Sequence, residues 1–344
     1  MFLYLQVTRG GDLKPGLPHP VWYSEPATIQ VNFNKLSENE LTIVTGYFEI
    51  GAFQKGFGGN IRTSKAYKKW LTVFARIKNP VVAYFDNAAN ADLMRVLRQN
   101  HPKTRISVID RRTLWCFREM HPRIVKIFAQ KKYPRHPPNT VKSNYTASVN
   151  SKYELMRWTI RDNPFRTAYI AWLDIGLFRS LAKGDVSSAV NNSELFRLGI
   201  PPDLNSSAVG YTLMYPRQSS PTLTAEAVVR GNIDWVSGAF FIGRIDVMWR
   251  WTTEFLSAVK RMVSEKWISA DQQTITWLMM GEGQKKIQPK TNLQLYKPAG
   301  LSDPWFYLGY LAKKIGKQNT VSPRPSADMI TSWPLKKVQP KPVG

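Results

Sequence analysis

The hydrophobic residues of this chain fall into short runs and helical stripes that alternate along the sequence. Runs rich in β-branched and aromatic residues occur at 41–48, 81–86 and 105–110 and predict buried strands. Behind Ser64, apolar residues recur every three or four positions and predict a capped helix, and a shorter helix is expected near 90–99. This alternation predicts a parallel sheet with right-handed crossovers.

The second half of the chain continues the pattern with longer elements. A helix over 149–161 precedes a buried strand at 168–176, and a further strand is predicted at 235–243. Two helices are expected after it, one near 246–265 and one that begins at Ser269-Ala270-Asp271.

The remaining segments are polar, basic or rich in proline. Residues 111–145 and 181–230 are expected to be irregular. The chain is therefore predicted to be an α/β protein with a mostly parallel central sheet flanked by helices. We divide it into an irregular N-terminal arm (1–40), a single folded domain (41–300) and a basic C-terminal tail (301–344).

The charge of the chain narrows the choice of partners. The sequence has 48 Lys and Arg against 24 Asp and Glu, a net charge of +24, which implies an anionic partner such as nucleic acid, a phosphate-bearing small molecule or an acidic membrane. One cysteine, Cys116, excludes an internal disulfide, and four histidines argue against a structural zinc site. We expect a cytoplasmic protein, because no signal peptide and no apolar run of about 20 residues is recognisable.

The first candidate for chemistry is Asp174, which ends the predicted strand 168–176. Ligands of open α/β sheets bind at the carboxyl ends of the strands. A carboxylate there can hold a divalent cation that neutralises a leaving diphosphate, since Mg²⁺ and Mn²⁺ prefer oxygen ligands. The same residue can equally be an ordinary cap of the turn that follows the strand.

Two further carboxylates stand near strand and helix ends. Asp234 and Trp235 offer a polar group and a flat ring to a sugar, just before the small residues around Gly238. Asp271 opens a predicted helix, where the dipole favours a carboxylate that acts as general base. Taken alone, the residues around Gly238 are explained more simply by strand packing, and Asp271 by a helix cap.

The order of these features resembles the HtrL/YibB family and, more broadly, glycosyltransferases of the GT-A type. The similarity covers roughly residues 41–280 and is most specific at the sequence WLDIG, residues 172–176. The other matching stretches are TIVTGYFEIG (42–51), SKAYKKWLTVFARIKNPVVAYFD (64–86), SKYELMRWTIRDNPFRTAYIAWLDIG (151–176), WVSGAFFIG (235–243) and SADQQ (269–273).

The resemblance implies a nucleotide-sugar-dependent glycosyltransferase with a GT-A-like catalytic domain, for which a UDP-sugar is the favoured donor. It implies a general base at Asp271 and a contact of Asp234 with the transferred sugar or the acceptor. The remaining residues are expected around the nucleotide sugar: Thr45, Gly46, Tyr47, Arg62, Asp86, Lys152, Arg157, Asp174 and Gly238.

The metal site implied by the resemblance is incomplete in this sequence. Asp174 would be the metal ligand for Mn²⁺ or Mg²⁺, but the second acid of the usual Asp-x-Asp motif is replaced by Gly176. The last histidine is His136, so no late histidine completes the site. Either Asp174 alone orients the cation with waters, or Lys and Arg side chains take over part of its function.

Other functions fit parts of the sequence less well. A nucleic-acid-binding protein would explain the charge, but the basic residues are scattered and no recognition motif appears. A catalytically inactive glycan-binding protein on the same fold stays open, because only one metal acid is present. The acceptor is expected to be a glycan or glycoconjugate, anionic given the charge of the chain, and the basic segments can make peripheral membrane contact. Paired-carboxylate and serine hydrolases lack their motifs.

Overall fold

The computed structural model describes residues 36–318, apart from 56–59, 192–193, 217 and 300–302. Most of the expected N-terminal arm and residues 319–344 of the expected tail therefore lie outside the described residues. In the part that is described, no helix is long and apolar enough to cross a membrane.

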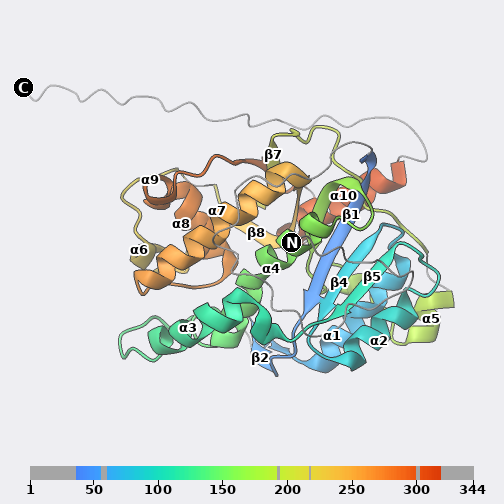
Figure 1. Cartoon of the computed structure of the whole chain (residues 1–344), viewed down its shortest axis with the longest axis horizontal. Helices are drawn as coiled ribbons and strands as arrows, with labels where there is room; N and C mark the ends of the chain where they lie inside the picture. Colours follow the sequence, from blue (N-terminus) through green and yellow to red (C-terminus); the bar gives the residue numbers. More distant parts are fainter. Residues whose placement is uncertain (1–35, 56–59, 192–193, 217, 300–302, 319–344) are drawn as a thin grey trace, which may run out of the picture.

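A seven-stranded sheet forms the centre of the molecule, with helices on both sides (Figure 1). The strands lie in the order β5-β4-β1-β6-β8-β7-β9, and a separate two-stranded hairpin, β2-β3, stands apart from them. The strand bounds are β1 (Ser37–Tyr47), β2 (Phe53–Gln54), β3 (Ile61–Arg62), β4 (Val81–Phe85), β5 (Thr104–Val108), β6 (Thr167–Leu173), β7 (Ala208–Leu213), β8 (Val236–Arg244) and β9 (Asn292–Tyr296).

Ten α-helices surround this sheet in the described part of the chain. Their bounds are α1 (Ser64–Leu71), α2 (Ala88–Leu97), α3 (His121–Phe128), α4 (Ser143–Asp162), α5 (Val186–Asn191), α6 (Ala225–Arg230), α7 (Ile245–Ser264), α8 (Asp271–Met280), α9 (Gly283–Ile287) and α10 (Tyr307–Gln318). The helix expected behind Ser64 ends early, because Thr72–Arg76 continue it as a tighter 3₁₀ segment.

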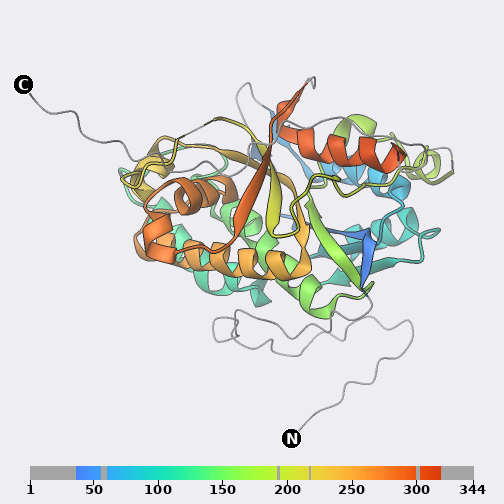
Figure 2. The same cartoon turned by 90° about the horizontal axis from the view of Figure 1, so that it is seen from above.

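The strands are hydrophobic on both faces because both faces of the sheet are covered. In β1, Ile43 belongs to a core cluster shared with α1, α2 and α10, whereas Val44 belongs to a second cluster shared with α4, α7 and α8. Figure 2 shows α10 in red on one side of the sheet and α7 in orange on the other. Continuous apolar runs are typical of strands buried in this way, so the α/β fold class predicted from the sequence is confirmed.

The sheet is mostly parallel, as predicted, with one reversed strand. β8 pairs antiparallel with both β6 and β7, and all other neighbours in the sheet pair parallel. From β1 the chain first winds outward through β4 to β5 and then returns to β6 on the other side of β1. The carboxyl ends of β1 and β6 therefore form a topological switch point, where open α/β sheets bind ligands.

Three stretches expected to be irregular contain ordered elements. The polar segment 181–230 includes the fully buried strand β7, and the basic stretch 111–145 includes α3, whose inner face carries Ile124, Ile127 and Phe128. Leu308 and Ala312 of α10 are buried in the core although they lie in the expected tail. Each element is short, between 6 and 12 residues, and stands in a polar or basic stretch, so that tertiary packing completes its stability.

A buried carboxyl at the centre of α4 makes the stability of the fold depend on pH. Glu154 accepts hydrogen bonds from the backbone N–H groups of Trp115 (2.6 Å) and Cys116 (3.1 Å), but burial dominates and raises its pKa to about 7. The folded protein thus holds a proton on Glu154 that the unfolded chain releases near pH 4.5.

We expect the contribution of Glu154 to the free energy of unfolding to fall by about 3 kcal/mol as the pH rises from about 4.5 to about 7, and to stay constant above that. Urea unfolding of the protein and of Glu154→Gln at several pH values measures this. The difference between the two proteins should change with pH in this window. The exposed substitution Glu226→Gln is the control, and an equal slope in all three proteins would contradict the prediction.

Candidate active site

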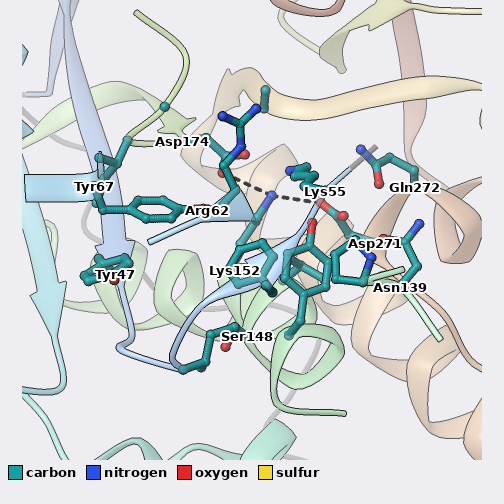
Figure 3. Close-up of a pocket in the computed structure, with 18 of the residues that line it drawn as sticks. Tyr47, Lys55, Arg62, Tyr67, Asn139, Ser148, Lys152, Asp174, Asp271 and Gln272 are labelled. Carbon is teal, nitrogen blue, oxygen red and sulfur yellow. Dashed lines mark hydrogen bonds and ion pairs between the residues drawn. The ribbon is translucent and has the colours of Figure 1, made fainter. Parts of the chain in front are cut away.

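A cavity of about 740 Å³ opens at the switch point of the sheet. Gly46 and Tyr47 reach it from the end of β1, Asp174 from the turn after β6, Lys152 from α4, and Asp271 from the start of α8. These residues are far apart in the sequence, and the strand order brings them together. Figure 3 shows the side chains around this cavity.

The inner wall of the cavity is an ion triad built around Lys152. The Nζ atom of Lys152 lies 3.1 Å from Oδ1 of Asp174 and 3.0 Å from Oδ2 of Asp271 (Figure 3). It donates a third hydrogen bond of 3.0 Å to the carbonyl of Gly238. An ammonium group has three donors. All three are therefore engaged by the protein itself.

Burial and charge act in opposite directions on this lysine. The side chains of Lys152 and Asp271 are 8% and 2% exposed, whereas that of Asp174 is 32% exposed. Burial alone would lower the pKa of Lys152, but the carboxylates of Asp174 and Asp271 outweigh it and hold the pKa above its ordinary value. Lys152 is a permanent cation in this site.

The turn after β6 fixes Asp174 from two sides. The indole N–H of Trp172 donates to Oδ1 of Asp174 at 2.6 Å, and the same oxygen meets Lys152. Two residues further on, a Cβ atom added to Gly176 would lie 3.2 Å from the ring of Trp70. The second acid of an Asp-x-Asp pair would therefore need this ring to move.

Aromatic rings and cations form the outer wall on the β1 side. The rings of Tyr47 and Tyr67 stack with their centroids 4.6 Å apart, and the guanidinium of Arg62 lies 5.2 Å from the ring of Trp70. Lys55 and Arg135 also line the cavity. Within the described residues, Lys55, Arg62 and Arg135 make no ion pair with a carboxylate.

Polar side chains from the α6–α8 region line the other side of the cavity. Asp234 accepts a hydrogen bond from Nε2 of Gln273, and the amide of Asn139 donates to Oδ1 of Asn232 at 3.1 Å. Gln272 faces the cavity beside Asp271. This wall offers hydrogen-bonding groups to a polar molecule close to a buried carboxylate.

Seven of the residues predicted from the sequence line the cavity: Gly46, Tyr47, Arg62, Lys152, Asp174, Asp234 and Asp271. Gly238 stands directly behind them. Its carbonyl holds Lys152, and a Cβ atom at this position would lie 2.2 Å from Oδ2 of Asp271.

The other three predicted residues, Thr45, Asp86 and Arg157, lie outside the cavity lining, and their contacts with a nucleotide sugar stay predictions. The Thr45 hydroxyl is buried and donates to the carbonyl of Leu173 at 2.7 Å. Asp86 pairs with Arg111 at 2.9 Å. Arg157 is buried between α4 and α7, with its guanidinium 3.8 Å from the Trp249 ring centroid, because five residues beyond Lys152 it leaves α4 on a different face.

Sequence reasoning missed several residues of the lining. Tyr67 and Trp70 had the helical spacing of a core face, and Arg135 stood among many scattered basic residues. Asp303 and Trp305 reach the cavity from the expected tail, where Asp303 pairs with Arg179 at 3.0 Å. The sequence DPWF at 303–306, in which an acid and a proline precede two adjacent aromatic residues, was the one local signal.

The donor set does not match a metal site held by the protein alone. Among the residues that the structure describes, no group of three His, Cys, Asp or Glu side chains could hold an ion. The two nearest carboxylates both face the ammonium of Lys152, which fills the position between them. The described residues therefore supply fewer than three protein ligands for the Mn²⁺ or Mg²⁺ expected at Asp174.

Comparison with solved structures gives glycosyltransferases at low similarity. The bifunctional glycosyltransferase WbbM, in its apo structure, has 10% sequence identity and a TM-score of 0.36, and the match covers 72% of this chain but 39% of WbbM. Mouse xyloside xylosyltransferase 1, also in its apo form, has 12% identity and a TM-score of 0.33, with 75% and 85% of the two chains covered.

Comparison with sequences gives a family and no individual relative. No curated protein sequence matches the chain. The family model described as "Bacterial protein of unknown function (HtrL_YibB)" matches residues 39–283, which include the whole inner wall of the cavity. The resemblance seen in the sequence is thus confirmed, and the chain belongs to the HtrL_YibB family.

Proposed function

We propose that this protein is a glycosyltransferase that moves a sugar from a nucleotide-diphosphate sugar, with a UDP-sugar as the first candidate, onto a hydroxyl of a glycan. One observation carries the proposal. Stacked aromatic rings, a deeply buried carboxylate and cations that pair with no carboxylate of the described residues line a single cavity at the switch point of the sheet. The volume of about 740 Å³ falls in the range of small-molecule sites.

The β1 side of the cavity suits the donor. A nucleotide base is flat and can stack on an aromatic ring such as Tyr47 or Tyr67. A diphosphate needs fixed positive charge, which Lys55, Arg62 and Arg135 supply, since none of them forms an ion pair with a carboxylate among the described residues. Because the chain as a whole has a net charge of +24, we propose that the acceptor glycan also carries negative charge.

The α8 side suits the chemical step. The acceptor oxygen attacks the anomeric carbon, the bond from this carbon to the phosphate oxygen breaks, and its electron pair leaves with the nucleoside diphosphate. Asp271 takes the proton of the attacking hydroxyl, so the reaction inverts the anomeric carbon. Asp234 and Asn139 bind hydroxyl groups of the sugars, and Asp174 aligns the donor.

Calorimetric titration with UDP, GDP and their sugars tests the donor side. We expect saturable binding of one nucleotide, weakened about 10- to 100-fold in Arg62→Met, because a charge-assisted hydrogen bond contributes about 1.5–3 kcal/mol. Arg123→Met is the matched control, since it removes the same charge from the exposed face of α3. Incubation of the bound nucleotide sugar with glycan acceptors then measures transfer.

Two results would contradict the proposal. Absence of binding to every nucleotide would exclude a nucleotide-sugar donor. Tight binding without transfer to any acceptor, and without slow hydrolysis of the donor, would instead favour the inactive glycan-binding protein considered above.

A further inference from the structure

The position of Lys152 differs from that of a side chain that binds phosphate. Its ammonium donates to Asp174, Asp271 and the carbonyl of Gly238, all at 3.0–3.1 Å, and these partners use its three protons. Only 8% of the side chain is exposed. Lys152 therefore has no donor left for a diphosphate, although it stands at the centre of the cavity wall.

The ammonium occupies the place in which a cation would bridge the two carboxylates. Asp174 comes from the turn after β6, and Asp271 comes from the start of α8. The ammonium of Lys152 lies between the two carboxylates and contacts both of them (Figure 3). Two carboxylates that converge on one point repel each other unless a positive charge separates them. In many enzymes a divalent metal ion has this function.

The neighbouring residues favour a lysine ammonium at this position and leave little room for a second metal-binding acid. Gly176, at the position of a second acid, packs against the ring of Trp70, so that a larger side chain would displace the ring. The indole N–H of Trp172 donates a hydrogen bond to the Asp174 oxygen that also contacts Lys152. The centroid of the Trp172 ring lies 5.8 Å from the ammonium. A lysine held between acids and beside an aromatic face is stabilised as a cation.

We propose that Lys152 replaces a protein-bound divalent cation and is the positioning residue that holds Asp174 and Asp271 apart and aligned. This inference deepens the proposed function and rests on it for the role of Asp271 as base. The consequence is a site that does not take up Mn²⁺ or Mg²⁺ by itself. Neutralisation of the leaving diphosphate falls to the cations on the β1 side, Lys55, Arg62 and Arg135.

The test measures the binding of Mn²⁺ alone, by electron paramagnetic resonance of the free ion, to the full chain and to Lys152→Ala. The unchanged protein should show no saturable site. In Lys152→Ala the two carboxylates face each other across an empty position, and a Mn²⁺ site should appear that is about tenfold or more stronger than any binding to the unchanged protein. The double variant Lys152→Ala/Asp174→Asn should lose it again.

Thermal unfolding of the same proteins provides a second readout. Mn²⁺ should raise the melting temperature of Lys152→Ala, because an ion that binds only the folded state stabilises it, and should leave the unchanged protein as it is. A merely structural lysine would lower stability without creating this metal dependence. If Lys152→Ala does not fold, Lys152→Gln is used instead. This variant should also gain a Mn²⁺ site, with a lower affinity than that expected for Lys152→Ala.

The outcomes separate this inference from the proposed function. Saturable Mn²⁺ binding to the unchanged protein that is lost in Asp174→Asn would overturn the inference, as would a folded Lys152 variant that gains no Mn²⁺ site. Neither result depends on a nucleotide or on transfer. Failure of nucleotide binding, in contrast, would leave the Mn²⁺ results intact and would remove only the catalytic meaning of the triad.

Discussion

Replacement of Asp271 by Asn is expected to lower the rate of sugar transfer about 10²- to 10⁴-fold, the usual contribution of a general base. The carboxylate is 2% exposed and lines the cavity, so that a hydroxyl bound in the cavity can reach it while bulk water is largely excluded. Asn has the same shape but cannot accept the proton. Donor affinity should change much less, because the proposed donor contacts lie on the β1 side.

The measurement is the turnover number with saturating donor and acceptor, together with the dissociation constant of the nucleotide. Asp246→Asn is the matched control, since Asp246 also stands in the first turn of a helix, on the exposed surface at the start of α7. It should behave like the unchanged protein. A loss of less than about tenfold in Asp271→Asn would assign the base to another residue, with Asp234 as the next to test.

Addition of one methyl group at Gly238 is expected to damage the site almost as severely. The Cβ atom of Ala at this position would lie 2.2 Å from Oδ2 of Asp271, well inside contact distance. Asp271 is buried on a helix and Gly238 on the central strand β8, so neither can move freely. The carboxylate must turn away from Lys152, and a displacement of about 1 Å costs on the order of 10²-fold in rate.

The same substitution should lower the free energy of unfolding by about 1–3 kcal/mol, as overpacking of a core does. Turnover and urea unfolding measure the two effects. Gly243→Ala on the same strand is the control, because its Cβ atom would first meet the flexible end of Met248 at 3.3 Å. Wild-type turnover in Gly238→Ala would mean that Asp271 does not need its present position.

The sequence alone predicts the elements whose apolar residues are strictly periodic or continuous. The strands near Ile43, Val82 and Ile170 are buried on both faces, and this burial gives the uninterrupted apolar runs from which they are recognised. α4 and α7 carry regular apolar stripes. β7, in contrast, is a short run that includes Gly210 within a polar segment, and its position next to the edge strand follows from pairing with β8 and β9.

The residues of the candidate site also fall into those that the sequence predicts and those whose role only the structure shows. Asp174 and Asp271 are recognisable in the sequence because they stand at the end of a strand and the start of a helix, where carboxylates are exposed to ligands or dipoles. Lys152 is predicted as a cation near the diphosphate. In the structure its three donors are taken by protein groups, which leaves the outer cations as the phosphate ligands of the proposed reaction.

Local sequence thus determines that this chain forms an α/β sheet and that acids stand at its carboxyl edge, because hydrophobic periodicity and end positions are properties of neighbouring residues. Only the tertiary structure decides that Lys152 meets Asp271, a residue 119 positions away, and that Gly238 is the glycine against which the carboxylate rests. Those contacts depend on the antiparallel register of β8 and on the packing of α4 and α8 across the switch point, and no local pattern encodes either one.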